Sequence, residues 1–186
     1  LVLAGGVALN SVYNGKILRE TPFKNLWIQP NASDGGTSMG AAYYIYNSIL
    51  KQKRGKFFDN AYTGPTYSNE EIKEFLDKNK IKYFEFKTRD QFLKTVSQLI
   101  FKNKVIGWFQ KGMEWGPRAL GSRSILSNPC EKNMQEILNL KVKHREKFRP
   151  FAPAVCVDDA LKYFDCDSPI PYPTDYMLMV YPVREE

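Results

Sequence analysis

The residues best suited to chemistry are arginines, serines and glycines gathered between Gly107 and Pro129. Arg118 and Arg123 carry planar guanidinium groups that can bind two oxygens of one anion at once. Ser122 and Ser124 add hydroxyl donors, and three interspersed glycines let backbone N–H groups approach a ligand closely. The segment therefore predicts an anion site, with an ordinary basic surface turn as the alternative. It is not a P-loop, because an arginine stands where that loop needs lysine.

A second basic segment runs from Lys141 to Pro153, where prolines and phenylalanines alternate with cations. The prolines favour an extended path. The side chains expected along one edge are Lys141, Lys143, Arg145 and Arg149. Two interpretations stay open: a basic groove with stacking aromatics for nucleic acid, or the wall of a pocket for a nucleotide triphosphate.

Two further segments are rich in glycine. Residues 3–10 place Gly5 and Gly6 between a predicted strand and a helix, with Asn10 shortly after. This arrangement is typical of nucleotide contacts, although a simple tight turn fits equally well. In residues 31–42, Asp34 precedes two glycines and could hold a metal or a metal-bound phosphate. The alternative is a capping or turn aspartate.

The composition narrows the classes of function. The net charge is +7, and lysines and arginines far outnumber glutamates between Phe101 and Pro150, which attracts anions. The three cysteines have no CxxC spacing and His144 is the only histidine, so a disulfide framework or a Cys- or His-rich metal site is disfavoured. No membrane span or signal-peptide pattern is present. A reducing cytoplasm is expected.

The remaining pattern predicts an α/β (α+β) fold in two domains. Predicted strands are Leu1–Ala4, Asn25–Gln29, Ile81–Phe86, Val105–Phe109, Phe151–Val157 and Tyr176–Tyr181. Predicted helices are Val7–Glu20, Thr37–Gln52, Asn69–Asn79, Arg89–Lys102 and Glu131–Leu140. A polar break at residues 51–56 divides domain 1–52 from domain 53–186. Two strands and two helices cannot close a core, so we expect a piece of a longer protein.

Taken together, the segments resemble the O-carbamoyltransferase family of the nodulation (NodU), cephamycin and tobramycin type. The resemblance covers nearly the whole chain. It rests on LAGGVALN at 3–10, SDGGTSMGAA at 33–42, YTGP at 62–65, MEWGPRALGSRSIL at 113–126 and LNLKVKHREKFRPFAP at 138–153.

The resemblance implies a fold and a reaction. Residues 1–52 would be the C-terminal part of a Kae1-like domain of the actin/hexokinase type, and residues 53–186 a truncated YrdC-like domain with a mixed sheet. In the family, the YrdC-like domain makes carbamoyl adenylate from carbamoyl phosphate and ATP, with Mg²⁺ expected beside the ATP. The Kae1-like domain then passes the carbamoyl group to a hydroxyl acceptor with a bound iron (Fe²⁺).

The resemblance also implies residue roles. Residues implied to bind carbamoyl phosphate and the ATP phosphates are Arg118, Arg123, Arg149, Lys141 and Arg145, with Ser124 as a further donor. Gly5, Gly6 and Asn10 would contact nucleotide, and Asp34 would be the metal ligand. The family pattern FQGRME is FQKGME here, so Lys111 is the substitute for an arginine contact.

The family's metal-binding histidines and its closing HVDG segment are absent from this sequence. We therefore expect that this chain alone does not complete O-carbamoylation. Alternatives are a hydrogenase-maturation (HypF-like) carbamoyltransferase, which has the opposite domain order, and a basic RNA-binding YrdC-like module. The expected partners are small-molecule phosphates and a hydroxylated acceptor, without membrane and with nucleic acid disfavoured; the oligomeric state, a homodimer included, stays open.

Overall fold

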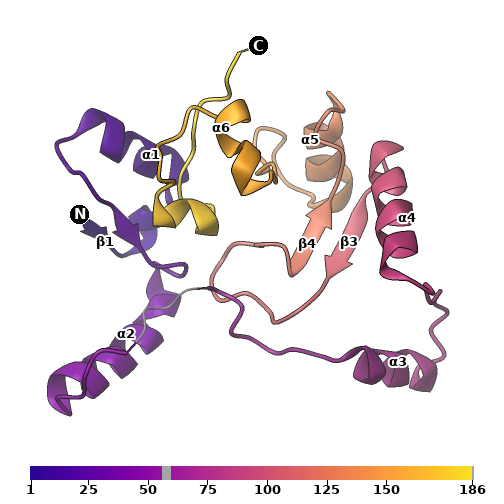
Figure 1. The fold of residues 1–186 in the computed structure, drawn as a ribbon, viewed down its shortest axis with the longest axis horizontal. Helices are drawn as coiled ribbons and strands as arrows, with labels where there is room; N and C mark the ends of the chain where they lie inside the picture. The colour runs from indigo at the N-terminus through magenta and orange to yellow at the C-terminus, as the bar shows by residue number, and fades with distance from the viewer. Residues whose placement is uncertain (56–59, 186) are drawn as a thin grey trace. The chain divides into compact units, whose positions relative to one another are not determined.

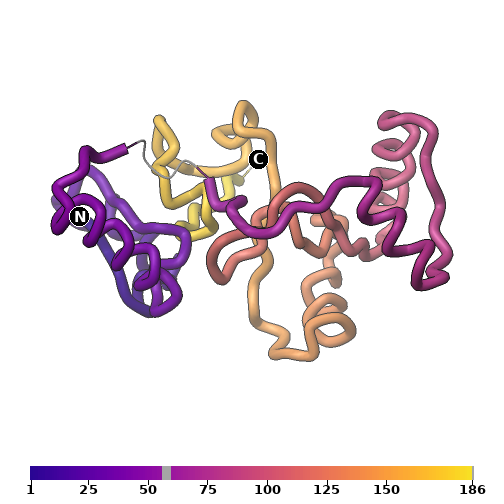
Figure 2. Tube along the Cα trace, turned by 90° about the horizontal axis from the view of Figure 1, so that it is seen from below, coloured from indigo at the N-terminus to yellow at the C-terminus, as the bar shows by residue number. Residues whose placement is uncertain are grey.

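The computed structural model describes residues 1–55 and 60–185. The chain divides into two compact units, each assembled from separated stretches. The first unit contains Leu1–Gly64, Met113–Leu120 and Ala154–Glu186, and the second contains Pro65–Gly112 and Gly121–Pro153. The chain therefore passes between them four times. Figure 2 traces its course by residue number. Lys56, the last residue of the predicted polar break, lies outside the described residues, and the domain boundary near residue 52 stays a prediction.

The first unit combines short helices with one small sheet. Its elements are β1 (Val2–Leu3), a 3₁₀ turn (Gly6–Leu9), α1 (Ser11–Glu20), β2 (Trp27–Ile28), a 3₁₀ turn (Asp34–Gly36), α2 (Thr37–Tyr43), a π-helix (Tyr44–Ile49), a 3₁₀ turn (Val157–Asp159), α6 (Ala160–Tyr163) and a 3₁₀ helix (Tyr172–Tyr176). β1 and β2 pair in parallel, with Leu3 opposite Ile28. Both predicted strands in this region are confirmed, although each has only two residues in the ladder.

The helix predicted from Val7 to Glu20 is two elements, because Asn10 ends the 3₁₀ turn and caps α1. Its Oδ1 accepts a hydrogen bond from Tyr13 N at 3.1 Å, which satisfies a backbone donor of the first helical turn. Gly15, a weak point of this helix by propensity, lies against the backbone of Val180. A Cβ at Gly15 would stand 2.3 Å from the Val180 carbonyl oxygen, so packing requires glycine there.

The core of the first unit joins the start of the chain to its last stretch. Ile28 and Leu178 are both 0% exposed, and Tyr176 is 3% exposed in the same cluster. The buried Asn14 of α1 donates from Nδ2 to the carbonyl oxygens of Ala8 (2.8 Å) and Leu178 (3.0 Å). These bonds satisfy the buried amide nitrogen, and they tie α1 to the C-terminal stretch.

Two predicted strands near the end of the sequence are wrong. Phe151–Val157 is exposed and has no ladder up to Cys156, because Pro153 removes a backbone donor and no strand among the described residues pairs with it. Tyr176–Tyr181 is not a strand either, since it starts at the end of a 3₁₀ helix and Met177 has a left-handed backbone (φ 55°). Its apolar side chains still enter the core, which explains the strand-like pattern.

The second unit contains a hairpin and four helical elements. These elements are α3 (Asn69–Lys78), α4 (Arg89–Phe101), β3 (Ile106–Phe109), β4 (Arg123–Leu126), α5 (Met134–Ile137) and a π-helix (Leu138–Val142). β3 and β4 pair antiparallel with Phe109 opposite Arg123. α4 lies beside this hairpin (Figure 1). Its Phe92 stacks on Trp108 of β3 with the ring centroids 5.5 Å apart. Ser68 caps α3, which begins where the sequence predicts it, and its Oγ accepts from Glu71 N at 3.2 Å.

β4 falls inside the glycine-rich segment and has no counterpart among the predicted strands. The strand predicted at Ile81–Phe86 is wrong, because its alternating aromatic side chains serve a different purpose. Phe84 and Phe86 meet edge to face at 4.9 Å, and Phe86 meets Phe92 of α4 at 5.3 Å. The alternation therefore reflects an aromatic cluster on α4 rather than sheet pairing.

The described residues thus form a mixed α/β structure with one two-stranded parallel and one two-stranded antiparallel sheet, which confirms the fold class. Within the described ranges, no helix has both the length and the apolar character that crossing a membrane requires. The Kae1-like and YrdC-like assignments stay predictions.

Candidate functional site

Three of the glycine-rich segments singled out in the sequence meet in the first unit. Gly5 N donates to the Ala32 carbonyl oxygen at 2.7 Å, which joins residues 3–10 to the loop before α2. Gly116 has φ +108°, and a Cβ there would stand 2.7 Å from the Pro30 carbonyl oxygen. The segment 113–120 can therefore pack on that same loop only with glycine at its centre.

Arg118 completes this glycine-rich junction. Its Nη2 donates to the Leu9 carbonyl oxygen at 2.9 Å, next to Asn10, while its buried Nε has no hydrogen-bond partner. The half-buried Arg118 side chain thus holds the end of the 3₁₀ turn Gly6–Leu9, just before α1 begins. The loop that carries it is fixed at Leu120, whose N–H donates to Glu114 Oε1 at 2.9 Å.

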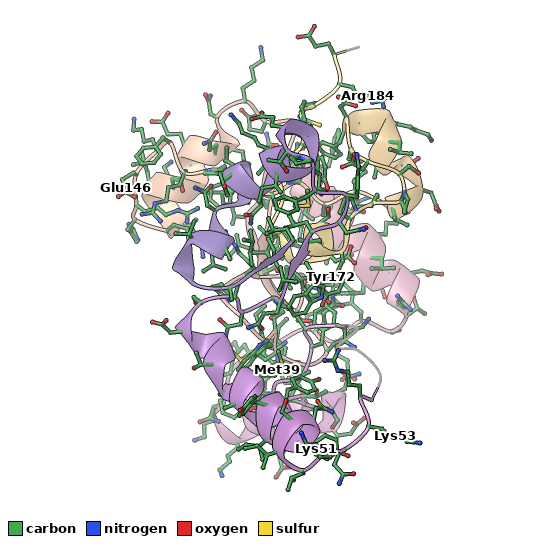
Figure 3. The ribbon with its side chains drawn as sticks, turned by 90° about the vertical axis from the view of Figure 1, so that its left-hand side faces the viewer. Met39, Lys51, Lys53, Glu146, Tyr172 and Arg184 are labelled. Carbon is green, nitrogen blue, oxygen red and sulfur yellow. The ribbon has the colours of Figure 1, made fainter. Side chains whose placement is uncertain are left out.

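A cavity of about 630 Å³ opens in the first unit. Two of the predicted site residues, Gly5 and Asp34, line it, whereas Gly6 and Asn10 do not. Trp27 and Tyr172 stand at its wall with nearly parallel rings (5°) and centroids 6.3 Å apart. Met39 and Tyr172, both labelled in Figure 3, belong to the same lining. Apolar aromatic walls with a few polar groups are typical of small-molecule sites.

The backbone at Gly5 and Gly6 is open to a ligand. Gly5 has φ +98°, and no heavy atom lies within 4 Å of where a Cβ would stand at either glycine. Asn10 Oδ1 already accepts from a helix N–H, so its second oxygen lone pair and its amide nitrogen are left for the predicted nucleotide contact.

Asp34 is exposed at the start of its 3₁₀ turn. Among residues 1–55 and 60–185, no group of three or more His, Cys, Asp or Glu side chains could hold a metal ion. Asp34 therefore offers a single carboxylate, and an iron site would need further ligands from outside the described residues.

Arg123 lies in the second unit and points its guanidinium at backbone oxygens. Nη1 donates to Gln110 O at 2.7 Å and to Ser122 O at 3.0 Å, and both Nη atoms reach Lys111 O at 3.3 Å. Its Cζ lies 3.5 Å from the centroid of the Phe109 ring. This carbonyl cage favours a structural role, because the fork that would bind an anion fixes the hairpin ends instead.

Lys111 and Ser124 flank that cage. Lys111 has a left-handed backbone (φ 50°), the conformation that glycine adopts at little cost. In the family pattern glycine occupies this position, so the exchanged Lys111–Gly112 order places the cationic side chain on a strained backbone. Ser124 Oγ accepts from Gly121 N at 3.0 Å, and its hydroxyl proton can still be donated.

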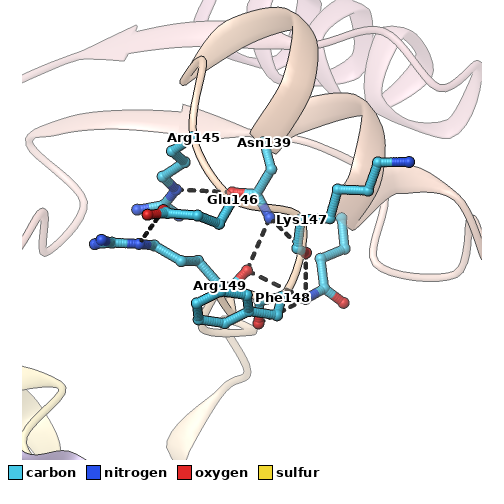
Figure 4. Close-up of polar contacts among 7 residues, drawn as sticks. Asn139, Arg145, Glu146, Lys147, Phe148 and Arg149 are labelled. Carbon is cyan, nitrogen blue, oxygen red and sulfur yellow. Dashed lines mark hydrogen bonds and ion pairs between the residues drawn. The ribbon is translucent and has the colours of Figure 1, made fainter.

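The other predicted cations lie on the basic loop, residues 143–149, and on the helix before it. Arg145 Nε donates to Asn139 Oδ1 at 2.7 Å, and Arg149 Nε donates to Glu146 Oε2 at 2.8 Å (Figure 4). Lys141 is exposed on the π-helix. The structure thus brings Lys141, Arg145 and Arg149 into one region of the second unit, while Arg118 belongs to the first.

Glu146 is the main counter-charge of the basic loop and carries a label in Figure 3. Its own backbone N–H and, next, the Arg149 guanidinium lower the pKa of the Glu146 carboxyl from its ordinary value. The carboxylate is therefore ionised at neutral pH and keeps Arg149 Nε engaged. Lys147 makes a second exposed ion pair, with Glu136 at 2.5 Å.

Sequence reasoning missed the residues that hold these groups in place. Asn139 is 0% exposed, and Gln135 stands one helical turn before it. The only signal for Asn139 was a polar residue between two leucines directly before the basic run. Trp27 and Tyr172 were missed as well, because their stacking joins positions distant in sequence.

Two family models match the chain. Residues 1–43 match the carbamoyltransferase N-terminus, and residues 97–186 match the carbamoyltransferase C-terminus. The chain belongs to the carbamoyltransferase family, which confirms the resemblance seen in its sequence.

Several individual proteins are similar to the chain over most of its length. An uncharacterized protein of Synechocystis sp., sll1178, is 44% identical over 191 residues, which cover 100% of this chain and 30% of the relative. Nodulation protein NolNO of Sinorhizobium fredii is 38% identical over 100% of this chain and 27% of its own length. Nodulation protein U of Rhizobium fredii is 31% identical over 92% of the chain and 27% of its own length. The chain thus spans less than a third of these relatives.

Proposed function

We propose that this chain is part of an O-carbamoyltransferase that activates carbamoyl phosphate with ATP and transfers the carbamoyl group to a hydroxyl of a small molecule or glycan. Membership of the carbamoyltransferase family supports carbamoyl transfer in general. The activation through carbamoyl adenylate, the acceptor and the action of the whole protein belong to the proposal.

The observation that carries the proposal is the way the basic loop presents its arginines. Arg145 and Arg149 are each held through Nε, by Asn139 and Glu146. Within the described residues, their Nη atoms make no hydrogen bond or ion pair. Such a pre-oriented guanidinium can offer its Nη donors to the oxygens of a phosphate without losing much conformational entropy.

This arrangement suits a reaction in which phosphate and pyrophosphate leave. Fixed cations stabilise the negative charge that develops on the leaving oxygens, and they need no reorganisation at the moment of reaction. Lys141 and Lys111 would add charge in the second unit. In the transfer step the acceptor oxygen forms a bond to the carbamoyl carbon, the bond to AMP breaks, and the hydroxyl proton leaves.

The cavity of the first unit is the proposed nucleotide contact, with Gly5 and the stacked aromatic rings at its wall. Bound Mg²⁺ would neutralise charge on the ATP phosphates. Among the described residues, Asp34 alone is too small a ligand set to hold iron. A cytoplasmic location and a homodimer form part of the same proposal.

The test is made on the full-length protein that contains this chain. With labelled carbamoyl phosphate and ATP, we expect AMP formation that requires both compounds. Arg149→Ala and Arg118→Ala should each lower kcat/KM for carbamoyl phosphate by about a hundredfold or more. Arg149→Ala removes a charge-assisted contact to the anion, and Arg118→Ala removes the hydrogen bond that anchors the Leu9 carbonyl. Arg89→Ala, at an exposed position of α4, serves as the control. ATP turnover that ignores carbamoyl phosphate would contradict the proposal.

One observation favours a second candidate function, RNA binding. Phe148 is 78% exposed within the basic loop, where an aromatic ring among cations could stack on a base. RNA affinity should then fall steeply with salt and should not depend on carbamoyl phosphate. A HypF-like enzyme is disfavoured, because the N-terminal family model precedes the C-terminal one in this chain.

A further inference from the structure

A buried amide stands at the base of the basic loop. Asn139, in the π-helix after α5, is 0% exposed, although its neighbours Leu140 and Lys141 are exposed. Its Oδ1 accepts from Arg145 Nε at 2.7 Å. Its Nδ2 donates to the carbonyl oxygens of Lys147 at 3.1 Å and Arg149 at 2.9 Å. Among the described residues, the side-chain hydrogen bonds of Asn139 therefore all end on the basic loop (Figure 4).

The backbone repeats this connection, since Arg145 N donates to the Asn139 carbonyl oxygen at 3.0 Å. Gln135 reaches the same loop, but its side chain is exposed, and its Nε2 lies 3.4 Å from Lys147 O and 3.1 Å from Arg149 O. Hydrogen bonds of a buried amide are worth more than those of an exposed one, because a broken bond leaves a desolvated group unpaired. Asn139 is thus the stronger of two parallel attachments.

The contacts of Asn139 decide where two guanidinium groups point. Its Oδ1 accepts from Arg145 Nε, and the Arg145 Cζ lies 5.0 Å from the centroid of the Phe151 ring, so two contacts hold this guanidinium while its Nη atoms make no hydrogen bond within the described residues. Its Nδ2 fixes the carbonyl of Arg149, whose Nε is held by Glu146. One side chain therefore sets the rotamer of Arg145 and the backbone of Arg149 together.

We propose that Asn139 is the positioning residue of the phosphate site, which orients Arg145 and Arg149 for the phosphate groups of carbamoyl phosphate and ATP. This inference rests on the proposed function for the identity of the substrates. It does not rest on it for the anion, because inorganic pyrophosphate can probe the loop directly. Asn139 acts through the two arginines and does not itself touch the ligand.

The test uses the full-length protein and compares Asn139→Asp with Gln135→Ala. Asn139→Asp keeps the volume and the oxygen that accepts from Arg145, but it turns the donor toward Lys147 O and Arg149 O into a repelling oxygen. We expect the Kd for inorganic pyrophosphate and the KM for carbamoyl phosphate to rise about ten- to a hundredfold, because a small displacement of a binding group costs about this much. The kcat should fall less. Gln135→Ala should change both constants less than about threefold.

A merely structural role gives a different result. Variants that lower only the folded fraction reduce kcat and leave KM and the pyrophosphate Kd unchanged, and that outcome overturns the inference. If Asn139→Asp does not fold, hydrogen exchange on the unsubstituted protein decides. Pyrophosphate should then slow exchange of the amides of residues 143–149, and no protection there also overturns it. Pyrophosphate binding lost in Asn139→Asp without carbamoylation by the parent protein would support the inference while the proposed function fails.

Discussion

Arg123 is the arginine for which sequence and structure suggest the most different roles, and Arg123→Lys separates them. The sequence places its guanidinium on a phosphate, whereas the structure places it among the carbonyls of Gln110, Lys111, Ser122 and Pro65. Lysine preserves the positive charge but not the planar fork. If Arg123 binds an anion, Arg123→Lys would weaken the anion affinity and leave the stability of the fold unchanged. If Arg123 holds the hairpin, the substitution would remove several hydrogen bonds to backbone carbonyls at once and lower the stability.

The magnitude follows from the contacts. Two hydrogen bonds, at 2.7 Å and 3.0 Å, have good lengths, and the contacts at 3.3 Å are weaker. Hydrogen bonds from a charged donor contribute about 1.5–3 kcal/mol each, and the ammonium of lysine can recover about one of them. Loss of the guanidinium over Phe109, 3.5 Å from the ring centroid, adds about 0.5–1 kcal/mol at a half-exposed site. Arg123→Lys should therefore lower the free energy of unfolding by about 2–4 kcal/mol.

Urea unfolding followed by tryptophan fluorescence measures this change, since Trp108 lies in the same hairpin. Arg89→Lys, exposed on α4, is the matched control and should stay within about 0.5 kcal/mol of the parent. The pyrophosphate Kd is measured on the same samples. Unchanged stability of Arg123→Lys together with a tenfold weaker pyrophosphate affinity would refute the structural assignment.

Three substitutions at backbone-limited positions test the packing by urea unfolding. Gly15→Ala should destabilise by about 1–3 kcal/mol because its Cβ would meet a carbonyl oxygen at 2.3 Å, while Gly40→Ala, in α2 with open space, should stabilise by about 0.5–1 kcal/mol; equal effects would contradict the packing of α1. Gly116→Ala, at φ +108°, should cost about 2 kcal/mol or more, against little change for Gly107→Ala in open space. Lys111→Gly should leave stability within about 0.5 kcal/mol, since relief at φ 50° offsets the entropy of glycine; a pyrophosphate Kd that does not rise would remove Lys111 from the anion site.

The parts of the fold that sequence predicted well are those set by local chemistry. The helices predicted at Asn69–Asn79 and Arg89–Lys102 match α3 and α4 to within one residue, because capping and helical periodicity need no distant partner. The strand at Ile81–Phe86 failed for the opposite reason. Alternation specifies which side chains share a face, but only a partner strand makes a ladder, and here the face meets α4 instead.

The candidate site followed the same rule. Residue types identified the cationic groups of the basic loop and the glycines of the first unit. They could not show that Asn139 is the group that holds Arg145, because the bond spans six positions and depends on a π-helix turn. Nor could they show that the donors of Arg123 are directed at backbone carbonyls, since that depends on how the hairpin closes.

The segment MEWGPRALGSRSIL illustrates why an unbroken motif need not form one site. Packing divides it after Leu120, with Arg118 on one side and Arg123 on the other. Each side of the division has its own anchors: the Leu120 carbonyl accepts from Tyr62 Oη at 2.7 Å, and the Gly121 carbonyl accepts from Gln110 Nε2 at 2.8 Å. The two arginines are close in sequence because the chain passes from one unit to the other between them, and each arginine holds the backbone of its own unit. Their effects on stability should be nearly additive, because the two arginines belong to different compact units.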